Sequence, residues 1–259
     1  DAQVRTELYT VTKNNGTRRT GILFKQEDSN LAPTIYLEEF YQKYLKGQQV
    51  PDLADSICSI YQEIRVKKTC DCQNLFDFNH VKEHIVYKLI RRDANEELLK
   101  QIPYEPFLDL AVVYYIQIDN TRFGSAAIQI RNEHLRYWRV EKEEIRRLAE
   151  KNTPRIYPVQ IRQIVRFMYV ATNEQCSLGA AVMRYPDFRE KVRGMIRGDF
   201  YILPSSIHEV ILVPESFGLE PERMQEMVKE INQTGVAPEE VLSDSVYYFD
   251  GEEIRIVAK

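Results

Sequence analysis

The chain has no long apolar run and few cysteines. Among its 259 residues, no uninterrupted apolar stretch approaches the roughly 20 residues that a membrane-spanning helix needs. Four cysteines are too few for a disulfide-based scaffold, so a reducing compartment is the simpler expectation. We therefore predict a cytoplasmic protein without a membrane partner.

Motifs of nucleotide chemistry are absent as well. The sequence contains no Walker-type phosphate loop, no glycine fingerprint for dinucleotides and no kinase signature. The net charge of −4 gives no general attraction to nucleic acid. We therefore expect no cofactor, and nucleic acid is not expected as the main partner.

What is present is the composition of an ordinary globular protein. Apolar residues make up 44% of the chain and charged residues 29%. The strongest strand signal is the nearly continuous apolar run FLDLAVVYYIQI at 107–118, which predicts a central strand covered on both faces.

Local signals divide the rest of the chain into short elements. Asn14-Asn15-Gly16 predicts a hairpin turn, because Asn and Gly tolerate positive φ. Thr34 is expected to cap a helix that runs to about Gly47. Other helices are expected near 51–66, 76–84, 95–102, 132–138, 140–152, 186–195 and 221–235. Other strands are expected at 85–90, 125–130, 168–173, 178–185, 199–204 and 208–214, with a hairpin over 246–258.

This order of elements predicts an α+β fold with mainly antiparallel sheets packed by helices, because few β-α-β units are present. Two prolines and no clear periodicity mark residues 153–165. We therefore predict two α+β subdomains, residues 1–155 and 156–259.

Several long blocks of the chain resemble a bacterial family of unknown function whose members come mostly from anaerobic gut bacteria. These blocks are VTKNNG (11–16), APTIYLEEFYQKY (32–44), PFLDLAVVYY (106–115), AEKNTPR (149–155), YILPSSIHEVILVP (201–214) and INQTGVAPEEVLSDSVYYFD (231–250). The third and fifth are also distantly similar to the YtpQ-like proteins. The resemblance implies no activity, substrate or catalytic residue. Between residues 154 and 168 the chain departs from the family, where a longer, partly acidic linker is expected.

The block YILPSSIHEVILVP brings Ser205, Ser206 and His208 into one short run, as in a serine hydrolase. In an extended strand, however, residues 206 and 208 lie about 7 Å apart at Cα, which is long for a hydrogen bond between hydroxyl and imidazole. Glu209 would point to the opposite face and could not orient the histidine. We interpret the three residues as candidate binding residues at a turn between two strands.

A second candidate is His80-Val81-Lys82-Glu83-His84, which matches the H-x-x-E-H pattern of inverted zincins. His80 and His84 could hold a metal from one helix face, although a third ligand is not evident and a solvated helix end is the favoured interpretation. The Cys70-Asp71-Cys72 pair has the wrong spacing for a typical zinc site and is interpreted as a polar loop.

Asp109 is the one acid in an apolar strand start, and a buried carboxylate needs a partner. We interpret it as a candidate binding residue, or as a carboxylate paired with an arginine. Charge is also uneven, with ten basic and five acidic residues in 131–166 and eleven acidic and two basic residues in 215–253. The basic segment could bind phosphates, but interleaved charges on one helix also fit a solvated face.

These features favour a binding or interaction protein whose partner, a protein or a small molecule, is unknown. An enzyme is not the favoured interpretation. The alternatives left open are a hydrolase, either metal-dependent at His80 and His84 or serine-type at Ser206 and His208, and a nucleic-acid-binding accessory protein. Self-association into a homo-oligomer also stays open.

Overall fold

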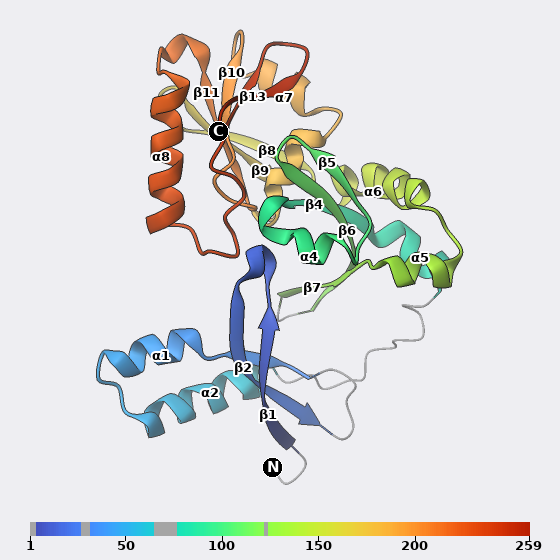
Figure 1. Cartoon of the computed structure of the whole chain (residues 1–259), viewed down its shortest axis with the longest axis vertical. Coiled ribbons are helices and arrows are strands. Elements are labelled where there is room, and N and C mark those ends of the chain that lie inside the picture. The colour runs from blue at the N-terminus through green and yellow to red at the C-terminus, as the bar shows by residue number, and fades with distance from the viewer. Residues whose placement is uncertain (1–3, 27–31, 65–76, 122–123) are drawn as a thin grey trace. The chain divides into compact units, whose positions relative to one another are not determined.

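The computed structural model describes residues 4–26, 32–64, 77–121 and 124–259 and has an α+β fold, as predicted (Figure 1). The chain divides into two compact units, residues 1–76 and 77–259. All strand neighbours in both units are antiparallel. No helix in the described ranges is long and apolar enough to cross a membrane.

The first unit is a three-stranded sheet with two helices on one face. Its strands are β1 (Val4–Thr12), β2 (Arg18–Gln26) and β3 (Thr34–Tyr36), in the order β1-β2-β3, and its helices are α1 (Glu38–Leu45) and α2 (Val50–Ile64). The predicted hairpin is confirmed, with Asn15 and Gly16 at positive φ. The expected start of a helix at Thr34 is wrong, because residues 34–36 pair with β2 and bury Ile35 in the core of the sheet.

The second unit begins with a four-stranded sheet. The strands are β4 (Ile85–Arg91), β5 (Tyr104–Phe107), β6 (Leu110–Thr121) and β7 (Gly124–Gln129), and β6 pairs with the other three. The helices of this half are α3 (Phe78–Val81), α4 (Glu96–Leu99), α5 (Asn132–Trp138) and α6 (Lys142–Ile156). The central position of β6 confirms the prediction, but the run 107–118 is broken into two strands by a turn at Leu108 and Asp109.

A six-stranded sheet follows in the order β13-β12-β10-β11-β9-β8. Its strands are β8 (Val159–Val165), β9 (Met168–Asn173), β10 (Phe200–Leu203), β11 (Val210–Pro214), β12 (Val246–Phe249) and β13 (Ile254–Ala258). Helix α8 (Pro221–Thr234) lies beside this sheet (Figure 1). Its Met224 and Val228 pack with Leu203, Val213 and Val246 of the sheet. The short helix α7 (Phe188–Arg193) contributes Phe188 and Val192 to the large core on the other side.

The main core of the second unit is shared by both of its sheets. It includes Tyr87 of β4, Tyr114 of β6 and Leu148 of α6 together with Ile202 of β10 and Leu212 of β11. The subdomain boundary expected between residues 155 and 156 therefore lies inside this unit. The sequence pattern did not indicate that residues 159–165 form β8, which joins the six-stranded sheet.

The strand expected at 178–185 is wrong, because residues Gly179–Arg184 form a 3-10 helix. Five of its six residues, 179–183, are buried, so their continuous apolar pattern reflects burial on all sides rather than a sheet position. The close approach depends on Gly179. A Cβ atom there would lie 2.5 Å from the His208 carbonyl oxygen and 2.8 Å from the Asn173 nitrogen.

Replacing Gly179 with alanine should therefore strain the contact between the 3-10 helix and β9. We expect Gly179→Ala to lower the free energy of unfolding by about 3 kcal/mol, since backbone atoms cannot move aside cheaply. Gly194→Ala is the control, because the nearest atom to its Cβ, the Lys191 carbonyl oxygen, would lie 3.3 Å away. Chemical denaturation of the two variants measures the difference, and equal stabilities would contradict this explanation.

Candidate functional site

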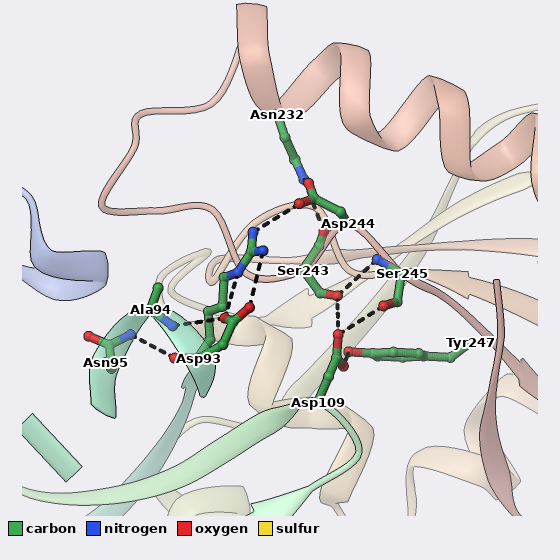
Figure 2. A network of polar contacts seen from close by, with 10 residues as sticks. Asp93, Ala94, Asn95, Asp109, Asn232, Ser243, Asp244, Ser245 and Tyr247 are labelled. Carbon is green, nitrogen blue, oxygen red and sulfur yellow. Dashed lines mark hydrogen bonds and ion pairs between the residues drawn. The ribbon is translucent and has the colours of Figure 1, made fainter. Parts of the chain in front are cut away.

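The strongest candidate site is built around Asp109, in the turn between β5 and β6. Leu108 has a φ of 55°, so the backbone turns sharply just before the acid. The Asp109 carbonyl oxygen accepts a hydrogen bond of 3.3 Å from the Arg92 backbone N–H, which joins the turn to the end of β4. The side chain is thereby directed toward the segment that leads into β12 (Figure 2).

Three hydroxyl groups donate to the Asp109 carboxylate. Ser243 Oγ and Ser245 Oγ lie 2.6 Å and 2.9 Å from Oδ2, and the Tyr247 hydroxyl donates to Oδ1 (Figure 2). Residues 243, 245 and 247 are all at most 2% exposed. Both oxygens of the carboxylate therefore already accept hydrogen bonds from buried side chains, an arrangement suited to holding the structure together.

Burial raises the pKa of the Tyr247 phenol well above its usual value, and the negative charge of Asp109 adds to the rise. The phenol therefore stays protonated and keeps donating to the carboxylate through the neutral pH range. Ser243 Oγ has a second role, because it accepts the Ser245 backbone N–H at 2.9 Å. The hydroxyl network thus fixes the backbone as well as the acid.

A second polar network lies beside the first and centres on Arg91 at the end of β4. Its guanidinium donates to Asp93 at 2.8 Å and to Asp244 at 2.9 Å. Asp244 also accepts from Asn232 Nδ2 of α8 at 2.8 Å (Figure 2). The hydrogen bond from Arg91 lowers the pKa of Asp93, and Asp244 forms an ion pair with the same guanidinium.

Both networks border one pocket of about 270 Å³. Its lining residues are Arg91, Arg92, Asp93, Asp109, Lys229, Asp244, Ser245 and Lys259. The three acids are already engaged, Asp93 and Asp244 by Arg91 and Asp109 by hydroxyl groups. In the described part of the chain, the side chains of Arg92, Lys229 and Lys259 form no hydrogen bond or ion pair, so the pocket has positive charge to offer.

The run that contains Ser205, Ser206 and His208 is bonded to the segment 241–243, which precedes the pocket residues Asp244 and Ser245. The Pro204 and Ser205 carbonyl oxygens accept the backbone N–H groups of Ser243 and Leu242 at 3.0 Å and 3.1 Å. Ser206 forms an isolated bridge with Val241. Residues 204–206 therefore hold the segment that presents Ser243 to Asp109.

The structure does not bring the Ser206 hydroxyl and the His208 imidazole together. Ser206 Oγ accepts the backbone N–H of His208 at 3.0 Å. His208 Nδ1 accepts the Leu178 N–H at 3.2 Å, and Nε2 lies 3.3 Å from a carboxylate oxygen of Glu240. These contacts place the ring proton on Nε2 and make His208 a link between two loops, whereas a serine nucleophile would need a free imidazole nitrogen.

The two histidines of the H-x-x-E-H pattern are also separated by a change of helix type. His80 lies in α3, whereas His84 ends a 3-10 helix over Lys82–His84. His80 Nδ1 contacts Asp77 at 2.8 Å. Across the described ranges, no group of three or more histidine, cysteine, aspartate or glutamate residues could hold a metal ion, while Cys70 and Cys72 lie outside those ranges.

The basic segment is partly neutralised by acids of the same unit. Arg147 pairs with Glu144 one turn away on α6 at 2.8 Å, and Arg146 lies 3.7 Å from Glu105 of β5. Interleaved ion pairs of this kind fit a solvated helix face.

The comparisons with known proteins identify a family. The model of the Family of unknown function (DUF5688) matches residues 1–168 and 165–251. The chain belongs to this family. No curated protein and no solved structure matches it significantly. The two matched segments overlap at residues 165–168, which lie at the turn between β8 and β9.

Sequence reasoning identified only one residue of the central cluster in this DUF5688 member. Asp109 was predicted as a candidate, whereas Arg91, Ser243, Ser245 and Tyr247 were missed. A signal was present, because Ser243, Ser245 and Tyr247 alternate and side chains two apart share one face of an extended segment. Three hydroxyl groups on one face can donate hydrogen bonds to a single carboxylate, so this pattern could have indicated the partners of Asp109.

The network predicts a specific effect of alkaline pH. The raised pKa of Tyr247 stabilises the folded state below pH 10, and this contribution is lost as the pH rises from about 10, the value in the unfolded chain, toward the folded value. We expect the difference in unfolding free energy between the wild type and Tyr247→Phe to shrink above that pH by up to about 1.4 kcal/mol per pH unit.

Urea denaturation between pH 8 and 11 measures this difference. Tyr41→Phe, which removes a surface phenol, is the matched control. A Tyr247→Phe difference that stays constant up to pH 11 would show that Asp109 and burial do not hold the proton on Tyr247.

Proposed function

We propose that this protein binds a small anionic molecule in the pocket beside Asp109. The observation that carries the proposal is that the acidic side chains of the pocket wall have hydrogen-bond donors, whereas most of its basic side chains have no acceptor in the described part of the chain. Each acid in the wall has donors within the chain, whereas the side chains of Arg92 and Lys229 have no partner among the described residues. Four basic and three acidic side chains line the pocket, so its side chains carry a net positive charge that an anion would neutralise.

The chemistry of the wall indicates which groups the ligand carries. A guanidinium binds carboxylate or phosphate oxygens through two parallel hydrogen bonds, and an ammonium adds a point charge. The volume of about 270 Å³ lies just below the usual range for ligand sites and suits a molecule of a few to about a dozen heavy atoms. Phosphate, a phosphorylated small molecule or a small di- or tricarboxylate meets these conditions.

A binding function agrees better with the site than a hydrolytic one. The Asp109 carboxylate is occupied by three hydroxyl donors, and the Ser243 hydroxyl donates to that acid, with no histidine in the cluster. A serine nucleophile needs a base that takes its proton, and both oxygens of this carboxylate already accept hydrogen bonds from other side chains. The rigid network instead favours a preorganised wall against which a ligand can dock.

The cellular setting is also part of the proposal. Scarce cysteines support a cytoplasmic location. The sequence blocks that resemble proteins of gut anaerobes support a bacterial origin and a distant relation to the YtpQ-like proteins.

Isothermal titration calorimetry at low ionic strength tests the proposal, with inorganic phosphate, phosphoglycerate and citrate as probes. We expect at least one probe to bind, and Arg92→Gln and Lys229→Gln each to weaken it about tenfold, the loss of one charge-assisted hydrogen bond. Arg223→Gln is the matched control, because Arg223 is an exposed cation of the same helix α8 that pairs with Glu226 outside the pocket.

Two results would overturn the proposal. One is that no probe binds at millimolar concentration. The other is that Arg223→Gln weakens binding as much as Lys229→Gln, which would indicate general attraction to a charged surface rather than a defined pocket.

A further inference from the structure

The first unit has an edge strand that is long, regular and almost entirely exposed. Strand β1 pairs with β2 over nine residues in continuous register, and no described strand pairs with its other edge. Seven of its nine residues are exposed, including Leu8 at 77% and Tyr9 at 47%. Natural edge strands are usually short, bulged or interrupted by proline, because their free N–H and C=O groups otherwise pair with another chain.

The two charged residues of β1, Arg5 and Glu7, indicate which kind of strand could pair with this edge. Arg5 lies directly opposite Lys25 of β2. Glu7 reaches diagonally to Lys25 at 2.6 Å. Arg5 and Glu7 are two residues apart, so they share one face of the sheet and lie on either side of Thr6.

We propose that the chain forms a two-fold symmetric dimer in which β1 pairs antiparallel with β1 of a second copy, centred on Thr6. In this register Arg5 of each strand lies opposite Glu7 of the other, which gives two opposite-charge pairs. Each Glu7 then lies between Lys25 of its own chain and Arg5 of its partner. A register centred on Leu8 would instead place Glu7 opposite Tyr9 and leave Arg5 beside Val11, without charge complementarity.

The other face of the sheet gains apolar contacts in the same register. Leu8 lies opposite Val4 of the second copy, and Val4 packs at the margin of the core formed by Phe24, Ile35 and Leu53. The exposed Leu8 side chain would therefore extend that core across the symmetry axis. The dimer would contain a continuous six-stranded sheet, in which β1 of each copy lies at the centre and β3 of each copy lies at an edge.

Analytical ultracentrifugation of the full chain tests the dimer through charge reversal. The wild type should dimerise, and Arg5→Glu should raise the dissociation constant about tenfold or more, because both pairs become repulsive. The double variant R5E/E7R should restore dimerisation, since the pairs re-form with opposite polarity. Arg5→Glu also places an acid opposite Lys25, so the variant should fold. Arg18→Glu, an exposed reversal on β2, is the matched control.

Cross-linking tests the register independently. Directly opposed residues of an antiparallel pair have Cα atoms about 4.5–5.5 Å apart, within disulfide range. Thr6→Cys should therefore give a covalent dimer on mild oxidation. Thr10→Cys should not, because the two copies of residue 10 would be about 27 Å apart along the strands.

Three results would overturn the dimer. They are a monomer at all concentrations, an equal effect of Arg5→Glu and Arg18→Glu, and cross-linking of Thr10→Cys as readily as Thr6→Cys.

Discussion

The donation of three hydroxyl groups to one carboxylate is the constraint on which the candidate site depends. Without donors, the partly buried charge of Asp109 would cost several kcal/mol, and with them each charge-assisted hydrogen bond contributes about 1.5–3 kcal/mol. The donors lie more than 130 residues away in the sequence, so the interaction ties the β5–β6 turn to the segment that enters β12. The positions of Asp244 and of the pocket wall follow from that connection.

The loop after β10 also fixes the segment that carries the hydroxyl donors of Asp109. Pro204 and Ser205 bind the backbone of residues 242–243, and His208 joins Leu178 to the stretch that contains Glu240. Ser205 and His208, whose side chains resemble those of a hydrolase site, therefore hold loops together in this structure. These structural side chains differ from Arg92 and Lys229, which line the pocket and whose side chains form no hydrogen bond or ion pair among the described residues.

Local elements were predicted from the sequence far better than their assembly. The Asn15-Gly16 hairpin, the central strand β6 and the helix α8 follow from turn chemistry and periodicity, which act over a few residues. The failures have one cause, which is that tertiary burial overrides local pattern. Thr34 joined a sheet, and residues 179–183 formed a buried 3-10 helix because Gly179 permits close backbone approach. The partners of Asp109 were not predicted because they are far from it in the sequence. The only local pattern that indicated them is the alternation of Ser243, Ser245 and Tyr247.

A double-mutant cycle between Asp109→Ala and Tyr247→Phe is the measurement that tests the hydroxyl–carboxylate network most directly. Unfolding free energies of the wild type, the two single variants and the double variant give the coupling between the two side chains. If the carboxylate holds the phenol as the structure indicates, the coupling should exceed about 1 kcal/mol, because the second substitution costs little once the first has broken the contact. Effects that add to within about 0.5 kcal/mol would contradict the network.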